Sequence, residues 1–219
     1  TPRIKDSLPD FSEDGIPDSF FEDVNDITVV ACGTAMYAGM VGKTMIQNRL
    51  HIPVTVAIAS EFRYEEPVIT DKSMVIFVSQ SGETIDTLEA LRLANKYTKK
   101  TLSIVNVKGS SIARESNYVL YTHAGPEIAV ASTKAYTVQA ATFYLLGCKL
   151  GLVSGKMTEA EAKEFIENLQ EVPNLIESVI TQAPDIEQLT KRMTNATNAF
   201  FIGRGLDYTL CMEGALKLK

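Results

Sequence analysis

Five polar residues and a glycine end an apolar stretch of the chain at the point where a helical pattern begins. They run from Ser79 to Thr84 with the sequence Ser-Gln-Ser-Gly-Glu-Thr. The hydroxyls of Ser79, Ser81 and Thr84 and the amide of Gln80 are neutral hydrogen-bond donors, and Gly82 lets the backbone approach a ligand closely. The N-terminus of a helix adds unpaired N–H groups and a partial positive charge. This set favours binding of a compact anion such as a phosphate ester.

Helix capping and a hydrolase nucleophile elbow are two other interpretations of this segment. Ser and Thr are common helix caps, and capping stays open, although a single cap would not need four such residues. A hydrolase nucleophile elbow also places a serine at a strand-to-helix turn. That motif has a glycine two residues before the serine, which both Ser79 and Ser81 lack. The two histidines, His51 and His123, lie in no motif that would activate such a nucleophile.

Two further segments hold candidate site residues. Gly33 and Thr34 follow the first apolar run in the sequence Ala-Cys-Gly-Thr-Ala, where they would form a second edge of the same pocket. Ser132 and Thr133 directly precede a long helical pattern. Both segments are also typical of ordinary strand-to-helix turns with capping residues.

The hydrophobic pattern indicates the elements that would position these segments. Five short apolar runs rich in Val and Ile are typical of strands buried on both faces: residues 27–31, 53–59, 73–78, 101–107 and 117–122. Helical patterns separate them, at 34–50, after 84 and at 135–150. This alternation predicts an α/β fold, a three-layer αβα sandwich with a five-stranded parallel sheet. Ligands bind such sheets beyond the carboxyl ends of the strands.

The expected organisation has four parts: an irregular lead-in at 1–26, a complete first unit at 27–152, connecting helices at 153–184, and the truncated start of a second, similar unit at 185–219. In the connecting part, Thr158 and Glu161 form the pattern of a capping box, and Pro173 is expected to kink or divide the helix. In the last part, residues 199–203 are predicted as a strand followed by a glycine turn and a helix.

Composition narrows the classes of partner. The net charge is -6 and Lys and Arg are not clustered, which argues against nucleic acid and against acidic membranes. The sequence has no apolar run of about 18 residues, the length of a membrane span, and no signal peptide. Three widely spaced cysteines argue against a disulfide framework or a zinc site. We expect a cytoplasmic protein with no metal and no cofactor.

Seven motifs taken in order carry a resemblance to a known family. They are CGTA, ASEFRY, SQSGETIDTL, GSSIARES, EIAVASTKAY, FIGRG and EGALKLK. Together they resemble the glutamine–fructose-6-phosphate aminotransferases, or glucosamine-6-phosphate synthases, from about Ile27 to Lys219. The similar region is the isomerase part of those enzymes, which is built from two sugar isomerase (SIS) domains.

The resemblance implies an activity and partners. Such enzymes convert fructose 6-phosphate and glutamine to glucosamine 6-phosphate and glutamate, through an imine and an aldose–ketose proton shift. Ammonia comes from an N-terminal glutaminase domain. The implied ligand is a hexose 6-phosphate of fructose, glucose or glucosamine, and the implied assembly is a homodimer. SIS-domain sugar-phosphate sensors in transcriptional regulators are the alternative, but they carry a helix-turn-helix segment that this sequence does not show.

The resemblance also implies site residues. The substrate-binding set is Thr34, Ala35, Ser79, Gln80, Ser81, Gly82, Thr84, Val130, Ala131 and Ser132. Ala35 stands where the family often has Ser, so one hydroxyl contact is missing there. Lys217 matches a lysine of the isomerisation site. The glutaminase domain would precede residue 1, and the proton-transfer glutamate would follow Lys219. We therefore expect the sequence as given to bind sugar phosphate without turning it over.

Overall fold

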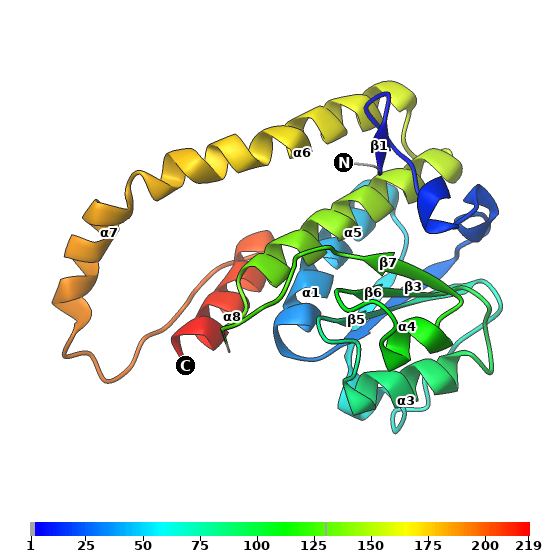
Figure 1. Ribbon diagram of the computed structural model, residues 1–219, viewed down its shortest axis with the longest axis horizontal. Coiled ribbons are helices and arrows are strands. Elements are labelled where there is room, and N and C mark those ends of the chain that lie inside the picture. Colours follow the sequence, from blue (N-terminus) through cyan, green and yellow to red (C-terminus); the bar gives the residue numbers. More distant parts are fainter. Residues whose placement is uncertain (1–2, 130) are drawn as a thin grey trace.

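The centre of the computed structural model, which describes residues 3–129 and 131–219, is one parallel sheet (Figure 1). Its strands are β3 (Asp26–Ala31), β4 (Val54–Ile58), β5 (Ser73–Ser79), β6 (Thr101–Val105) and β7 (Tyr118–Tyr121). They lie in the order β4-β3-β5-β6-β7 with every neighbouring pair parallel. Every residue of the central strand β5 is buried, as its continuous apolar run predicts. The predicted five-stranded parallel sheet is confirmed.

Helices cover both faces of this sheet, which confirms the predicted three layers (Figure 1). The long helices α1 (Gly33–Leu50) and α5 (Lys134–Val153) pack together on one face. The shorter helices α2 (Ala59–Phe62), α3 (Ile85–Ala94) and α4 (Ser111–Glu115) cover the other. One hydrophobic cluster fills the space on each side of the sheet. Burial of these apolar side chains holds the layers together.

Two glycines set how closely α1 approaches its neighbours. A side chain at Gly39 would lie 2.7 Å from Val29 Cγ1 on β3, and one at Gly42 would overlap the ring of Phe143 on α5. Because neither position has a side chain, α1 lies directly on β3 and against α5. The start of α1, which carries Thr34, is thereby held close to the end of its own strand.

The lead-in contributes to the core although its backbone is largely irregular. It contains a small antiparallel pair, β1 (Ile4–Lys5) and β2 (Leu8–Pro9), and two short 3-10 turns, η1 (Ser12–Asp14) and η2 (Asp18–Phe20). Its aromatic side chains Phe11 and Phe21 are each 1% exposed and belong to the cluster beneath α1 and α5. The lead-in therefore closes one end of that cluster.

The connecting segment forms one long helix, α6 (Glu159–Ile180). The predicted capping box at its start is confirmed, since Thr158 and Glu161 each bond the backbone N–H of the other. Of the two expected effects of Pro173, division of the helix is wrong, because α6 continues through this residue, and a kink stays a prediction. This half of the helix is exposed, so water can bond the backbone carbonyl that proline leaves without a donor.

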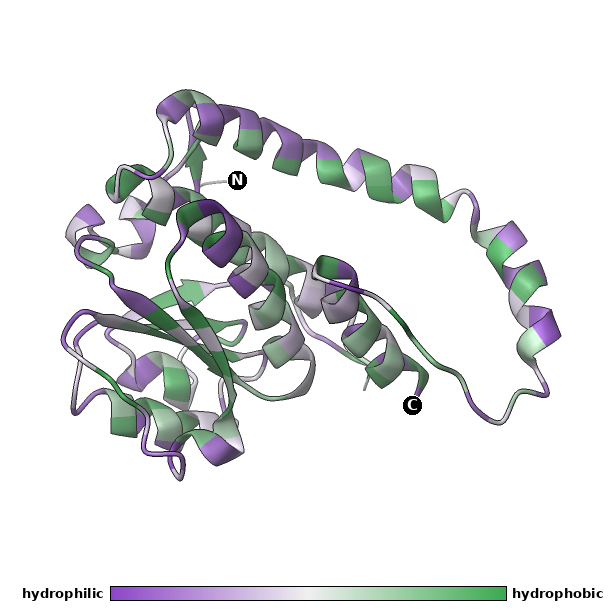
Figure 2. Cartoon of the chain, turned by 180° about the vertical axis from the view of Figure 1, so that it is seen from behind, coloured by the Kyte–Doolittle hydropathy of each residue, from purple (hydrophilic) through white to green (hydrophobic). Residues whose placement is uncertain are grey.

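The last part of the chain contains α7 (Ala183–Thr190), η3 (Lys191–Met193) and α8 (Leu206–Leu218). The strand predicted at 199–203 is wrong: these residues form no strand and pair with none of the described strands. A strand needs a neighbour to bond its backbone groups. Helix α8 instead packs back against α1. Figure 2 shows apolar residues along the strands and also along α6 and α7. In the described chain, every helix is too short or too polar to cross a bilayer.

Candidate functional site

A pocket of about 220 Å³ lies beyond the carboxyl ends of β3 and β5. In chain order the sheet reads 2-1-3-4-5, so the direction of winding reverses between these two strands, where such folds bind ligands. The pocket is lined by three segments that the sequence pattern singled out, together with α5: Cys32, Thr34, Ala35, Val78, Ser79, Gln80, Ser81, Thr84, Ser132 and Gln139. The fold therefore brings together most of the predicted substrate-binding set.

The loop between β5 and α3 is held in shape by its own hydroxyls. Ser79 Oγ accepts a hydrogen bond from the Gly82 N–H at 3.0 Å and lies 3.0 Å from Thr84 Oγ1. Gly82 has a φ of +68°, and a side chain there would overlap Ser110. Gly82 thus shapes the loop rather than lining the pocket. Ser81 Oγ accepts from the Glu83 N–H at 3.2 Å.

The helix-capping interpretation of this loop is not supported. Thr84 occupies the N-cap position of α3, but its side chain makes no capping hydrogen bond. Cys32 holds the same position on α1, again without a side-chain cap. Both helices thus begin at the pocket with first-turn N–H groups that no N-cap side chain covers, and each brings a partial positive charge. An anion placed there would receive these N–H groups as donors.

The third wall, at the start of α5, already holds a carboxylate. Glu127 Oε2 accepts hydrogen bonds from Ser132 Oγ at 3.2 Å and from the Ala135 N–H at 3.3 Å. Ser132 therefore faces a ligand mainly as an acceptor. Ala131 is exposed and is not part of the pocket lining. The predicted site residue Val130 lies outside the described residues.

A lysine from the far end of the sequence reaches the rim of this pocket. Lys217 Nζ on α8 donates a hydrogen bond of 2.7 Å to Thr34 Oγ1 and lies 2.9 Å from Glu213 Oε1. The lining side chains given above are neutral, so Lys217 adds a cation beside them. The Thr34 hydroxyl accepts a hydrogen bond from Lys217, so its own O–H can donate a hydrogen bond to a ligand.

Two buried residues at this junction were missed by the reasoning from sequence. Gln139 on α5 lines the pocket and is 2% exposed. Glu213 on α8 is 7% exposed. Burial, and next the charge of Glu213, raise the pKa of Tyr136 to about 12. Gln139 follows Tyr136 by three residues, within the mostly apolar helical pattern at 135–150. A polar residue inside that apolar pattern was the signal available in the sequence.

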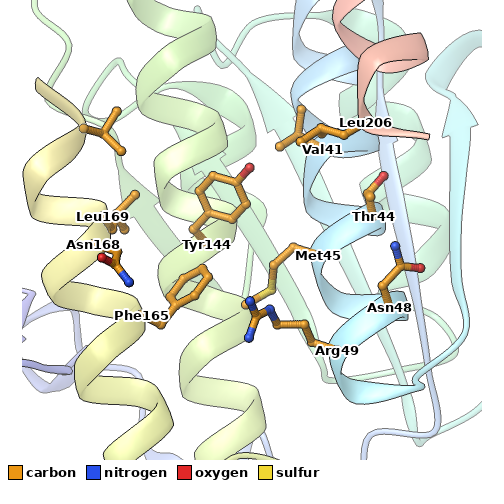
Figure 3. A pocket seen from close by; sticks show the side chains of 11 residues that line it. Val41, Thr44, Met45, Asn48, Arg49, Tyr144, Phe165, Asn168, Leu169 and Leu206 are labelled. Carbon is orange, nitrogen blue, oxygen red and sulfur yellow. The ribbon is translucent and has the colours of Figure 1, made fainter. Parts of the chain in front are cut away.

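A larger cavity of about 400 Å³ lies between α1, α5 and α6 (Figure 3). Its lining is mostly apolar, with Met45, Tyr144 and Phe165 around its centre. Arg49 lies with its guanidinium 5.5 Å from the centre of the Phe165 ring, which is a cation–π contact within the protein. One helix start, that of α8 at Leu206, reaches this cavity, but the cavity lacks the paired helix starts and the hydroxyl cluster of the smaller pocket, so the smaller pocket is the candidate site.

Comparison with known families and proteins shows which family the chain is similar to. The family model described as "SIS domain" matches residues 20–148. The glutamine–fructose-6-phosphate aminotransferase [isomerizing] of Leifsonia xyli is 45% identical over 94% of this chain and 33% of its own length. The enzyme of the same name from Thermotoga maritima is 43% identical over 99% of this chain and 36% of its own length. The chain thus spans about a third of these curated relatives.

A solved structure extends the similarity to the whole described fold. The C-terminal domain of glucosamine-fructose-6-phosphate aminotransferase from Francisella tularensis superposes with a TM-score of 0.94 at 36% identity. The match covers 99% of this chain and 61% of that one. The resemblance predicted from the seven ordered motifs is confirmed by these comparisons.

The position of Lys217 predicts that its charge contributes to anion binding. In the Lys217→Met variant we expect the affinity for inorganic phosphate to fall about fivefold. The variant loses the attraction between one positive charge and the anion, which acts through a medium of effective dielectric ~20. Isothermal titration calorimetry measures this. Lys191→Met removes the same charge on η3, far from the pocket, and should leave the affinity unchanged. Equal affinities for both variants would show that Lys217 does not act on the pocket.

Proposed function

Because the chain belongs to the SIS domain family, we propose that its pocket beyond β3 and β5 binds a hexose 6-phosphate through the phosphate group. One observation carries this proposal: two helix N-termini without side-chain caps meet a loop of hydroxyl and amide groups at one pocket. Such N-termini bind phosphate in other proteins. A phosphate monoester carries a charge of about -1.5 to -2 at pH 7, and here it would be met by several short-range donors rather than by a cluster of cations.

We assign the phosphate to the loop between β5 and α3, where Ser79, Gln80, Ser81 and Thr84 provide donors. The sugar part then lies toward α1 and α5, against Thr34, Ala35 and Ser132. Since Ala35 has no hydroxyl, only its backbone serves as a partner there. Lys217 approaches the sugar end through its contact with Thr34, which agrees with the isomerisation role that the resemblance implies for it.

For the whole protein we propose the reaction in the names of its curated relatives, glutamine–fructose-6-phosphate aminotransferase, isomerizing. Fructose 6-phosphate would become glucosamine 6-phosphate, with ammonia from a glutaminase domain elsewhere in the protein and without a cofactor. The 219 residues supply the sugar-phosphate pocket and one lysine of the isomerisation site. We place the protein in the cytoplasm, in keeping with the free thiols of Cys32, Cys148 and Cys211.

We also propose that residues 27–152 are a first SIS unit, that 153–184 connect it, and that 185–219 begin a second. The family match over residues 20–148 supports this division. Helix α8 then represents an element of the second unit that docks on α1 of the first. Such docking explains how a residue from the second unit, Lys217, reaches a pocket of the first.

We propose a homodimer from the apolar surface of the connecting helices. Helix α6 packs its first half on α5, and Ile166 there is fully buried. The apolar stripe continues into the second half, which is exposed, and onto α7: Val172, Leu175, Ile176, Val179, Ile180, Ile186 and Leu189. A self-complementary stripe of this kind pairs with its own copy most readily by two-fold symmetry.

The phosphate assignment predicts a loss of binding in a double variant. Each hydrogen bond to a charged group contributes about 1.5–3 kcal/mol, so Ser79→Ala with Thr84→Ala should weaken binding of fructose 6-phosphate at least about a hundredfold. Calorimetric titration measures this, and circular dichroism checks the fold. Ser178→Ala with Thr181→Ala changes a similar hydroxyl pair on exposed turns of α6 and should not alter binding. Unchanged affinity in the first variant would end the assignment.

Dimer formation predicts concentration-dependent sedimentation. In analytical ultracentrifugation the chain should shift from monomer to dimer as its concentration rises. The double variant Ile176→Asp, Ile180→Asp should keep the chain monomeric, because burying two carboxylates at the interface costs more free energy than dimer formation releases. A wild-type chain that stays monomeric at every concentration would contradict the proposed dimer.

A further inference from the structure

Gln139 is a polar side chain among the buried residues of α5. It lies in the second turn of α5, is 2% exposed, and still lines the pocket beyond β3 and β5. Its amide oxygen has no hydrogen-bond partner among the described residues. A buried amide left without a partner costs about 1–3 kcal/mol, whereas an apolar side chain of similar size would cost nothing. The geometry therefore points to a partner that enters the pocket.

The pocket is large enough for a partner beyond the phosphate. Its volume of about 220 Å³ is several times the ~30 Å³ that one water occupies in the liquid. The phosphate donors come from the loop between β5 and α3, whereas Gln139 comes from α5, in the wall that also holds Ser132. A ligand anchored at the loop thus turns its uncharged part toward Gln139.

The chemistry of an amide suits an uncharged hydroxyl. The Gln139 side chain offers one acceptor oxygen and two N–H donors, and a hydroxyl both donates and accepts. In the same wall, the Ser132 hydroxyl donates a hydrogen bond to Glu127, so its oxygen remains available to a ligand as an acceptor. Gln139 and Ser132 together thus present a donor and acceptors to the same part of the ligand.

A second polar group on α5 serves as a comparison within the same helix. The buried hydroxyl of Tyr136 also has no hydrogen-bond partner among the described residues. However, it is not part of the pocket lining, and it lies near enough to Glu213 to feel its charge. Tyr136 therefore lies on the side of α5 toward Glu213, whereas Gln139 lines the pocket.

We propose that Gln139 is a specificity-determining residue that hydrogen-bonds a hydroxyl of the sugar part of the bound hexose phosphate. This inference rests on the proposed function, since it needs a hexose phosphate in this pocket. It assigns to Gln139 the recognition of the sugar, and to the loop between β5 and α3 the recognition of the phosphate.

The test compares two probes on the full 219-residue chain. Fructose 6-phosphate and inorganic phosphate are titrated calorimetrically into the wild type and into Gln139→Leu, which keeps the volume and removes the polar atoms. We expect the affinity for fructose 6-phosphate to fall about tenfold and that for inorganic phosphate to change less than twofold. Gln170→Leu, on the exposed surface of α6, is the matched control and should leave both affinities unchanged.

The remaining outcomes separate this inference from the proposed function. A Gln139→Leu variant that loses both affinities equally, or neither, would overturn the role of Gln139 while the phosphate site stands. A wild-type chain that binds neither probe would overturn the proposed function and this inference with it. If Gln139→Leu does not give the circular dichroism spectrum of the folded wild type, Gln139→Met carries the same comparison with a more flexible side chain.

Discussion

The parallel pairing of β3 with β5 is the constraint on which the site depends. Residues Asp26–Val30 lie in register with Ser73–Phe77, so both strands end at the same edge of the sheet. Each strand then turns into a helix, and the two helix starts come to lie side by side although about fifty residues separate them in sequence. The glycines of α1 keep that helix close to β3 and α5. A change of register or of helix distance would separate the groups that line the pocket.

The electrostatics of the pocket differ from those of the whole protein. The net charge of -6 opposes anion binding only weakly, because surface charges are screened over ~8 Å at physiological salt. Within the pocket, an anion would meet N–H groups, hydroxyls and the dipoles of α1 and α3 at contact distance. Lys217 adds one full charge, held by Thr34 and Glu213. Fixed neutral donors of this kind need little reorganisation when the ligand binds.

The strands, the layers and most of the pocket could be predicted from sequence because they follow from local patterns. An apolar run that ends in hydroxyl residues and a glycine marked β5 and the loop after it. The pocket then follows from the order of the strands, which places the ends of β3 and β5 side by side. The failures have a different origin. Whether Pro173 ends a helix depends on solvent around it, and whether residues 199–203 form a strand depends on a neighbour. Gln139 and Glu213 matter through neighbours far apart in sequence: Gln139 lines the pocket with residues that follow β3 and β5, and Glu213 pairs with Lys217, which reaches Thr34.

The proposed function requires that the loop between β5 and α3 hold the phosphate of a hexose 6-phosphate while α5 faces the sugar. A crystal structure of the chain with fructose 6-phosphate tests it most directly. We expect the phosphate within hydrogen-bond distance of the groups between Ser79 and Thr84, and the sugar hydroxyls toward Gln139. Phosphate bound elsewhere, for example beside Arg49 in the cavity between α1, α5 and α6, would contradict it.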